Sequence, residues 1–120
     1  MPTVCHFEIP ADDPQRAKKF YEDLFGWEIK HYPDMDYYGI MTGPEGKALN
    51  GGMMKRQAPE QTPVNYIDVD SVESYAKKVQ DLGGRIVMEK TPVPGMGWFI
   101  ICLDSENNAF GLWEGDEKAA

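Results

Sequence analysis

The chain has 120 residues, 42% hydrophobic and 27% charged, which is the composition of an ordinary globular domain. Its 12 basic and 20 acidic residues give a net charge of -8. This charge argues against a nucleic-acid or anionic-membrane partner, because either calls for a basic face. There is no signal-peptide pattern and no apolar run near the roughly 20 residues of a membrane span, so we expect a cytoplasmic protein.

The two cysteines, Cys5 and Cys102, lie in apolar, strand-like runs without the spacing of a zinc or redox motif. We therefore expect buried, reduced thiols, with a disulfide as the less favoured alternative. The sequence also lacks GxSxG, HExxH and phosphate-loop motifs, so those reaction classes have no support.

The first predicted element is a β-strand at residues 3–10, TVCHFEIP. Apolar and polar side chains alternate here with the period of a half-buried strand. Phe7 and Ile9 lie on one face, and His6 and Glu8 lie on the other. The two polar side chains therefore share a face.

An amphipathic helix is predicted next, over residues 14–25. Asp12 or Asp13 can cap its start, and Gly26 can adopt the left-handed conformation that ends a helix. Its apolar stripe consists of Ala17, Phe20, Tyr21, Leu24 and Phe25. Three short strands are expected within residues 27–32, 36–42 and 48–55.

The C-terminal half repeats the order of strand, helix and three strands. A strand at residues 64–69 puts Tyr66 and Asp68 on one face, and a helix follows within residues 70–84. Asp70 and Glu73 have the spacing of a capping box. The apolar stripe consists of Val72, Tyr75, Val79 and Leu82. Strands are expected at residues 85–90, 98–103 and 109–114, and the polar run 104–108 predicts a hairpin between the last two.

The shared order indicates a duplicated module. AKKF at residues 17–20 and AKKV at residues 76–79 occupy comparable places. We expect one domain over residues 1–120, with modules at about 1–56 and 63–114 and a frayed tail. One helix can cover only one face of four strands, so the other face must meet the second module, a subunit or a ligand. This argument points to a cleft between the modules.

Two stretches carry a family resemblance, FEIPADDPQRAKKFYEDLFGW near the start and VDSVESYAKKVQDLGGRIVMEKTPVPGMGWFIICLDSENNAFGLWE near the end. The chain resembles the vicinal oxygen chelate superfamily, the glyoxalase, bleomycin-resistance and extradiol-dioxygenase group. The resemblance implies an α+β fold of two βαβββ modules, whose curved mixed sheets surround a cavity, and it implies a homodimer. Members include metal-dependent lyases, isomerases and dioxygenases, and also proteins that only bind an antibiotic.

In the metal-dependent members, the ligands come from the first and last strands of each module. By position these ligands would fall on His6, near Val64, at or beside Gly51 and Gly52, and on Gly111. Only His6 can ligate a metal, so the family's metal site is expected to be lost.

A rearranged site for a divalent metal remains an alternative. His6 and Glu8 would have α-carbons roughly 6 to 7 Å apart on one strand face. A catalytic metal needs about three protein ligands, and the available acids are Asp68 and Glu114. Asp68 is preferred, because strict alternation puts Glu114 on the face opposite Gly111. We predict no resident cofactor, with a metal on His6, Glu8 and Asp68 as the alternative.

His6 and Glu8 are the candidate catalytic residues, because a histidine can exchange protons near neutral pH. The alternative is an inert hydrogen-bonded couple. The candidate ligand-binding residues are Tyr66, Asp68, Trp98 and Trp113. Each has a structural alternative: Asp68 can help to cap the helix beginning near Ser71, and the tryptophans can belong to the core or to a dimer interface.

Tyr37, Tyr38 and Met53 carry the same ambiguity between ligand contact and packing. Residues 91–98, TPVPGMGW, can form a lid or a stiff connector. His31 is expected to be exposed to solvent.

Three functions follow from these residues. The first is binding of a small organic molecule, neutral or cationic, in the inter-module cavity without a metal. The second is a vicinal oxygen chelate enzyme, a lyase, isomerase or dioxygenase-like protein, that uses His6 and Glu8 as acid and base or in a rearranged metal site. The third is a structural or interaction module whose cleft is closed.

Overall fold

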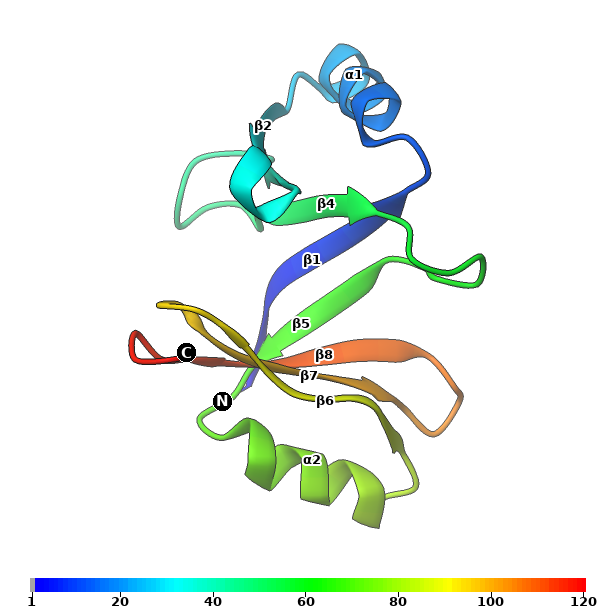
Figure 1. The fold of residues 1–120 in the computed structure, drawn as a ribbon, viewed down its shortest axis with the longest axis vertical. Coiled ribbons are helices and arrows are strands. Elements are labelled where there is room, and N and C mark those ends of the chain that lie inside the picture. The colour runs from blue at the N-terminus through cyan, green and yellow to red at the C-terminus, as the bar shows by residue number, and fades with distance from the viewer. Residues whose placement is uncertain (1) are drawn as a thin grey trace. The chain divides into compact units, whose positions relative to one another are not determined.

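The computed structural model describes residues 2–120 and shows an α+β protein of two βαβββ modules (Figure 1). It divides into an N-terminal unit, residues 6–63, and a C-terminal unit, residues 2–5 with 64–120. The first module contains β1 (Thr3–Ala11), α1 (Pro14–Phe25), β2 (Glu28–Tyr32), the short 3-10 helix η1 (Pro33–Met35), β3 (Tyr37–Met41) and β4 (Gly51–Lys55). The second contains β5 (Val64–Asp68), α2 (Val72–Asp81), β6 (Arg85–Val93), β7 (Gly97–Leu103) and β8 (Ala109–Gly115).

The sheet of the N-terminal unit has the strand order β2-β3-β4-β1. β1 and β4 are parallel, and the other neighbours are antiparallel. α1 covers one face of this sheet (Figure 1). The core beneath the helix consists of Ala11, Ile29, Tyr38, Ile40 and Met53, with Phe7, Ile9, Ala17, Tyr21 and Trp27 packed against it. The predicted alternation of β1 is confirmed, because Phe7 and Ile9 point toward this core.

α1 begins and ends as the sequence predicts. Asp13 accepts a hydrogen bond from the backbone N–H of Arg16 at 3.2 Å, and Gly26 ends the helix at φ 71°. The predicted stripe is wider than the core, however. Its remaining members, Phe20, Leu24 and Phe25, are 56–59% exposed. Only Ala17 and Tyr21 of the stripe pack against the core.

The C-terminal unit repeats this plan with the strand order β5-β8-β7-β6, in which β5 and β8 are parallel. α2 runs along one face of the sheet (Figure 1). The buried core residues are Val69, Val72, Ile100, Cys102 and Leu112. Leu82 is 82% exposed and does not belong to the helix stripe, because α2 has already ended at Asp81.

The start of α2 differs from the prediction. Ser71, not Asp70, is the cap, and its hydroxyl oxygen accepts from the backbone N–H of Ser74 at 3.2 Å. The Glu114 carboxylate in β8 accepts from the backbone N–H of Val72 at 3.0 Å. A carboxylate at a helix N-terminus is stabilised by the helix dipole and by the otherwise unpaired N–H groups. Glu114 is therefore a structural residue on the helix-covered face.

Two turns near the C-terminus connect neighbouring antiparallel strands, β7 to β8 and β6 to β7. The predicted hairpin at residues 104–108 is confirmed, and its Asp104 side chain accepts from the backbone N–H groups of Glu106 and Asn108 at 2.8 and 2.9 Å. In residues 91–98 the strands extend further than expected, so only a short turn separates β6 from β7. The tail is docked rather than frayed, because Ala119 is buried and its carbonyl accepts from Gly95 N–H at 2.9 Å.

The two cysteines differ in environment. Cys102 is fully buried, as predicted, and burial raises the pKa of its thiol to about 11. Cys5 is exposed, which corrects the prediction, because it lies at the start of β1 before the core begins. Partial desolvation, followed by the nearby Asp68 charge, raises the pKa of the Cys5 thiol. Both cysteines are free thiols.

We expect Cys5 to react with a chromogenic disulfide reagent in the folded protein and Cys102 to stay protected until the protein unfolds. The thiolate is the reactive form, so the raised pKa should make the Cys5 rate climb through a higher pH range than that of an ordinary thiol. Stopped-flow absorbance of wild type, Cys5→Ser and Cys102→Ser measures this. Two equally fast thiols, or a rate that levels off below about pH 8.5, would contradict the expectation.

Over residues 2–120, neither α1 nor α2 has the length and apolar character that a membrane-crossing helix requires.

Candidate functional site

The sheet face opposite α1 carries a hydrogen-bonded cluster of His6, Tyr37 and Glu8. His6 Nε2 lies 2.8 Å from the Tyr37 hydroxyl, which donates to Glu8 Oε2 at 3.0 Å. The direct separation of His6 Nε2 and Glu8 Oε2 is 3.9 Å, too long for a hydrogen bond. The phenol of Tyr37 therefore connects the two residues that strand alternation places on one face.

Gly52 makes room for this phenol. In the β3–β4 and β1–β4 pairings, Gly52 lies opposite Gly39 and Glu8. A Cβ at Gly52 would lie 1.7 Å from the Tyr37 hydroxyl oxygen. Any larger residue at this position must displace the ring, so the glycine and the tyrosine are sterically coupled.

The cluster is partly shielded from water. The side chains of His6 and Glu8 are 36% and 16% exposed. Desolvation lowers the pKa of His6, and the Glu8 charge opposes this to a smaller extent. The lowered pKa favours the neutral form of His6, the state in which an imidazole can accept a proton.

The sheet face opposite α2 carries three aromatic rings, which we call the aromatic platform: Tyr66 on β5, Phe99 on β7 and Trp113 on β8. Two of them lie over glycines of the neighbouring strand. A Cβ at Gly111 would lie 2.3 Å from the Tyr66 ring, and one at Gly97 would lie 2.6 Å from the Trp113 ring. Phe99 meets Tyr66 edge to face, with ring centroids 6.3 Å apart. Tyr66 is buried, whereas Phe99 and Trp113 are half-buried.

Two predicted ligand-binding residues occupy different settings. Trp98 packs on the face that α2 covers, and its indole N–H donates to Asp116 at 3.1 Å. The Lys90 ammonium lies 4.5 Å from its ring centroid. Strand alternation thus puts Trp98 on the other face of the sheet from Trp113, and its ligand contact stays a prediction. Asp68 pairs with Trp113 between β5 and β8 and is exposed, while Ser71 and Glu114 cap the helix in its place.

Sequence reasoning missed Phe99 and left Tyr37 undecided between ligand contact and packing, for different reasons. Alternation within WFIICL was enough to place the Phe99 side chain on the other face of the strand from Trp98. Tyr37 and Tyr38 are adjacent and chemically alike, so only the observed register decides between them. Tyr37 reaches His6 and Glu8, while Tyr38 is buried under α1 and its hydroxyl accepts from Gln15 at 2.8 Å.

His31 is not the solvent-exposed residue that the sequence predicts. Its ring is half-buried and stacks on Tyr38, with centroids 4.3 Å apart and an interplanar angle of 16°. Its Nε2 atom is buried without a hydrogen-bond partner. The antiparallel pairing of β2 and β3 puts His31 opposite Tyr38 and so determines this contact.

We expect His31→Phe to stabilise the protein by about 1 kcal/mol, because a buried polar atom without a partner is unfavourable and a phenyl ring can keep the stacking. Urea unfolding measures the effect, with His31→Ala as the control that loses the ring. Equal or lower stability of the phenylalanine variant would show that the imidazole nitrogen of His31 has a hydrogen-bond partner in solution.

The residues at the family's metal positions do not fit a metal ion. The last-strand ligands were expected at or beside Gly51 and Gly52 and on Gly111, and the rings of Tyr37 and Tyr66 occupy the space next to the α-carbons of Gly52 and Gly111. Among residues 2–120, no three His, Cys, Asp or Glu side chains are grouped so that they could hold a metal. The predicted trio of His6, Glu8 and Asp68 thus gains no support.

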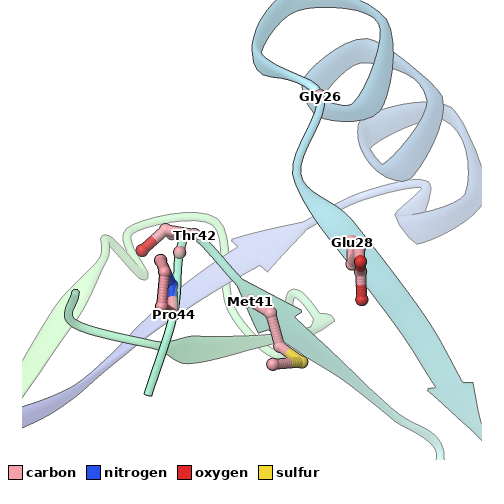
Figure 2. Close-up of a pocket in the computed structure, with 6 residues that line it drawn as sticks. Gly26, Glu28, Met41, Thr42 and Pro44 are labelled. Carbon is pink, nitrogen blue, oxygen red and sulfur yellow. The ribbon is translucent and has the colours of Figure 1, made fainter. Parts of the chain in front are cut away.

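A shallow pocket with a volume of about 320 Å³ lies elsewhere in the N-terminal unit. It is lined by Gly26, Glu28, Met41, Thr42, Gly43 and Pro44 (Figure 2). Glu28 is the single charged side chain among them. None of the predicted site residues lines this pocket, and one carboxylate beside small residues indicates no particular chemistry.

Sequence comparison identifies relatives of this chain. A family model described as the Glyoxalase/Bleomycin resistance protein/Dioxygenase superfamily matches residues 3–112. CFP32 of Mycobacterium tuberculosis, provisionally named a glyoxylase, is 32% identical over 113 residues, which cover 89% of this chain and 43% of CFP32. The chain thus spans less than half the length of this curated relative.

Solved structures share the fold at low sequence identity. A superfamily member from Vibrio splendidus has a TM-score of 0.67 at 15% identity, covering 97% of this chain and 100% of that protein. Methylmalonyl-CoA epimerase from Mycobacterium tuberculosis has a TM-score of 0.64 at 15% identity, covering 94% and 87%. These structures confirm the expected fold, and the family model over residues 3–112 establishes that the chain belongs to the glyoxalase/bleomycin resistance protein/dioxygenase superfamily, the vicinal oxygen chelate group.

Proposed function

We propose that this chain binds a small organic molecule on the aromatic platform, without a metal ion. The observation that supports this most directly is the pair of half-buried rings, Phe99 and Trp113, on a sheet face that α2 does not cover. Aromatic surfaces of this kind bind planar or apolar parts of ligands. The net charge of -8 and the neighbouring Asp68 favour a neutral or cationic ligand.

Tryptophan fluorescence tests this proposal with a screen of neutral and cationic aromatic compounds. A ligand should change the emission of wild type and of Trp98→Phe, because Trp98 lies on the other face of the sheet. The Trp113→Phe variant should lose the response. Trp98→Phe is the matched control, since it removes an indole without altering the platform. A broad screen without any response, or a response that survives in Trp113→Phe, would refute the proposal.

The second candidate function is proton transfer by His6, supported by its hydrogen-bonded connection through Tyr37 to Glu8. A neutral imidazole can remove a proton from a carbon next to a carbonyl group. The C–H bond breaks, its electron pair moves toward the carbonyl oxygen, and the proton stays on the imidazole until it returns to carbon. The Glu8 carboxylate would stabilise the resulting imidazolium through Tyr37.

Deuterium exchange at carbon in D₂O tests this candidate. Lactoylglutathione and methylmalonyl-CoA are suitable probes, because named relatives and structural neighbours include a lactoylglutathione lyase and a methylmalonyl-CoA epimerase. We would expect exchange catalysed by wild type and lost in His6→Gln. The same slow background exchange with both proteins would exclude activity on these carbon acids.

We also propose that the chain forms a homodimer, which the exposed side chains of Phe20, Leu24 and Phe25 on α1 support. Light scattering after size-exclusion chromatography should give twice the chain mass of 13.6 kDa. Replacing Leu24 by Glu should then produce monomers. A wild-type mass equal to one chain would refute the proposal.

A further inference from the structure

The hydroxyl of Tyr37 lies between two groups but has only one proton to donate. That proton is directed to Glu8 Oε2 at 3.0 Å. The Tyr37 hydroxyl oxygen also lies 2.8 Å from His6 Nε2. Because its one proton is donated to Glu8, this oxygen can only accept a hydrogen bond from the His6 nitrogen. The proton of a neutral His6 ring must then be on Nε2, and Nδ1 must carry the lone pair.

We infer that Tyr37 is a positioning residue that holds neutral His6 in the Nε2–H tautomer and thereby makes Nδ1 its basic atom. Use of Nδ1 as a base depends on the proton-transfer function proposed above. The tautomer itself is inferred from the hydrogen bonds that Tyr37 makes with His6 and Glu8, and it does not require the proton-transfer function.

The opposite tautomer is disfavoured by the charges present. It would require Tyr37 to donate to His6 Nε2, which would leave the phenol oxygen facing Glu8 Oε2 at 3.0 Å without a proton between them. A hydrogen bond to a carboxylate is also stronger than one to a neutral nitrogen. Glu8 is only 16% exposed, so water competes weakly for this carboxylate.

Steric contacts keep the phenol in this position. The Tyr37 hydroxyl occupies the space that a side chain at residue 52 would fill, so this position is open to it only because residue 52 is glycine. His6 and Glu8 are too far apart to bond directly, at 3.9 Å. The tautomer therefore depends on Tyr37 and cannot be set by Glu8 alone.

Long-range ¹H–¹⁵N correlation spectra of the imidazole rings at about pH 8, where an ordinary histidine is neutral, test this inference directly. The chain has two histidines, so His31→Asn assigns the signals of His6. In wild type, we expect Nε2 to show the shift of a protonated ring nitrogen and Nδ1 that of an unprotonated one. In Tyr37→Phe, both shifts should move toward each other, as in a ring that exchanges between tautomers.

The Tyr32→Phe variant is the matched control, because it removes a tyrosine hydroxyl from the neighbouring strand β2 and should leave the His6 shifts unchanged. Amide spectra verify that each variant is folded. A protonated Nδ1 in wild type, or His6 shifts that do not respond to Tyr37→Phe, would overturn the inference. Absence of carbon-acid exchange with the tautomer confirmed would instead refute only the proton-transfer function.

Discussion

Replacing Gly52 by alanine is expected to destabilise the protein by about 3 kcal/mol, because the new methyl group would overlap the Tyr37 phenol. The ideal Cβ position lies 1.7 Å from the hydroxyl oxygen and 2.1 Å from the ring carbon that bears it. Gly52 is buried in β4 between two paired strands, so its backbone cannot move away cheaply. The ring must rotate out and leave His6 and Glu8.

Urea unfolding measures this loss, and Gly115→Ala is its control. The nearest atom to a Cβ at Gly115 is 4.0 Å away, so this variant should stay within about 0.5 kcal/mol of wild type. Combining Gly52→Ala with Tyr37→Ser should be less damaging than the sum of the two single changes, by about 2 kcal/mol, because the small serine removes the overlap. Additive losses of stability would show that the Tyr37 ring is not what prevents a larger side chain at residue 52.

The second large effect is expected for Gly111→Glu, which installs a carboxylate at the family's metal position in β8. The ideal Cβ lies 2.3 to 2.9 Å from three atoms of the Tyr66 ring. We therefore expect a loss of about 3 kcal/mol or more and no gain in metal binding, since the rings of the platform occupy the space that a metal and its ligand would need.

Urea unfolding, together with metal analysis of protein purified without chelator, tests this expectation. Gly111→Ala separates the steric effect from that of the charge and should already account for most of the loss. Adding Tyr66→Ala to Gly111→Glu should recover part of the stability. A well-folded Gly111→Glu protein that binds one divalent ion more tightly than wild type would show that the metal site needs only this carboxylate.

Both glycines relate to a tyrosine in the same way, although the tyrosines come from different places in the two modules. Tyr37 reaches Gly52 from β3, and Tyr66 reaches Gly111 from β5. In each module a phenol therefore fills the space beside a glycine at the family's last-strand position. A carboxylate side chain in place of either glycine would therefore require a second change at the tyrosine.

The sequence was sufficient for the order of elements and for most of their faces. Strand alternation placed His6 and Glu8 together, and the Asp104 turn and the Gly26 helix end were evident from local chemistry. These features depend on residues close together in the chain. Local side-chain patterns therefore suffice to specify them.

Features that depend on pairing between distant strands could not be derived in this way. The choice of Tyr37 over Tyr38 as the partner of His6 follows from the β3–β4 register, and the Glu114 cap follows from β8 lying beside the start of α2. Burial was the other weak point, as exposed Cys5 and half-buried His31 illustrate.

The sequence by itself determined that the chain has two βαβββ modules, and it predicted that the family's metal ligands are missing, because periodicity and residue identity are local properties. Only the tertiary structure decided what stands in their place. The Tyr37 hydroxyl lies between His6 and Glu8, and aromatic rings cover the glycines, because strand register brings together side chains from segments far apart in the chain.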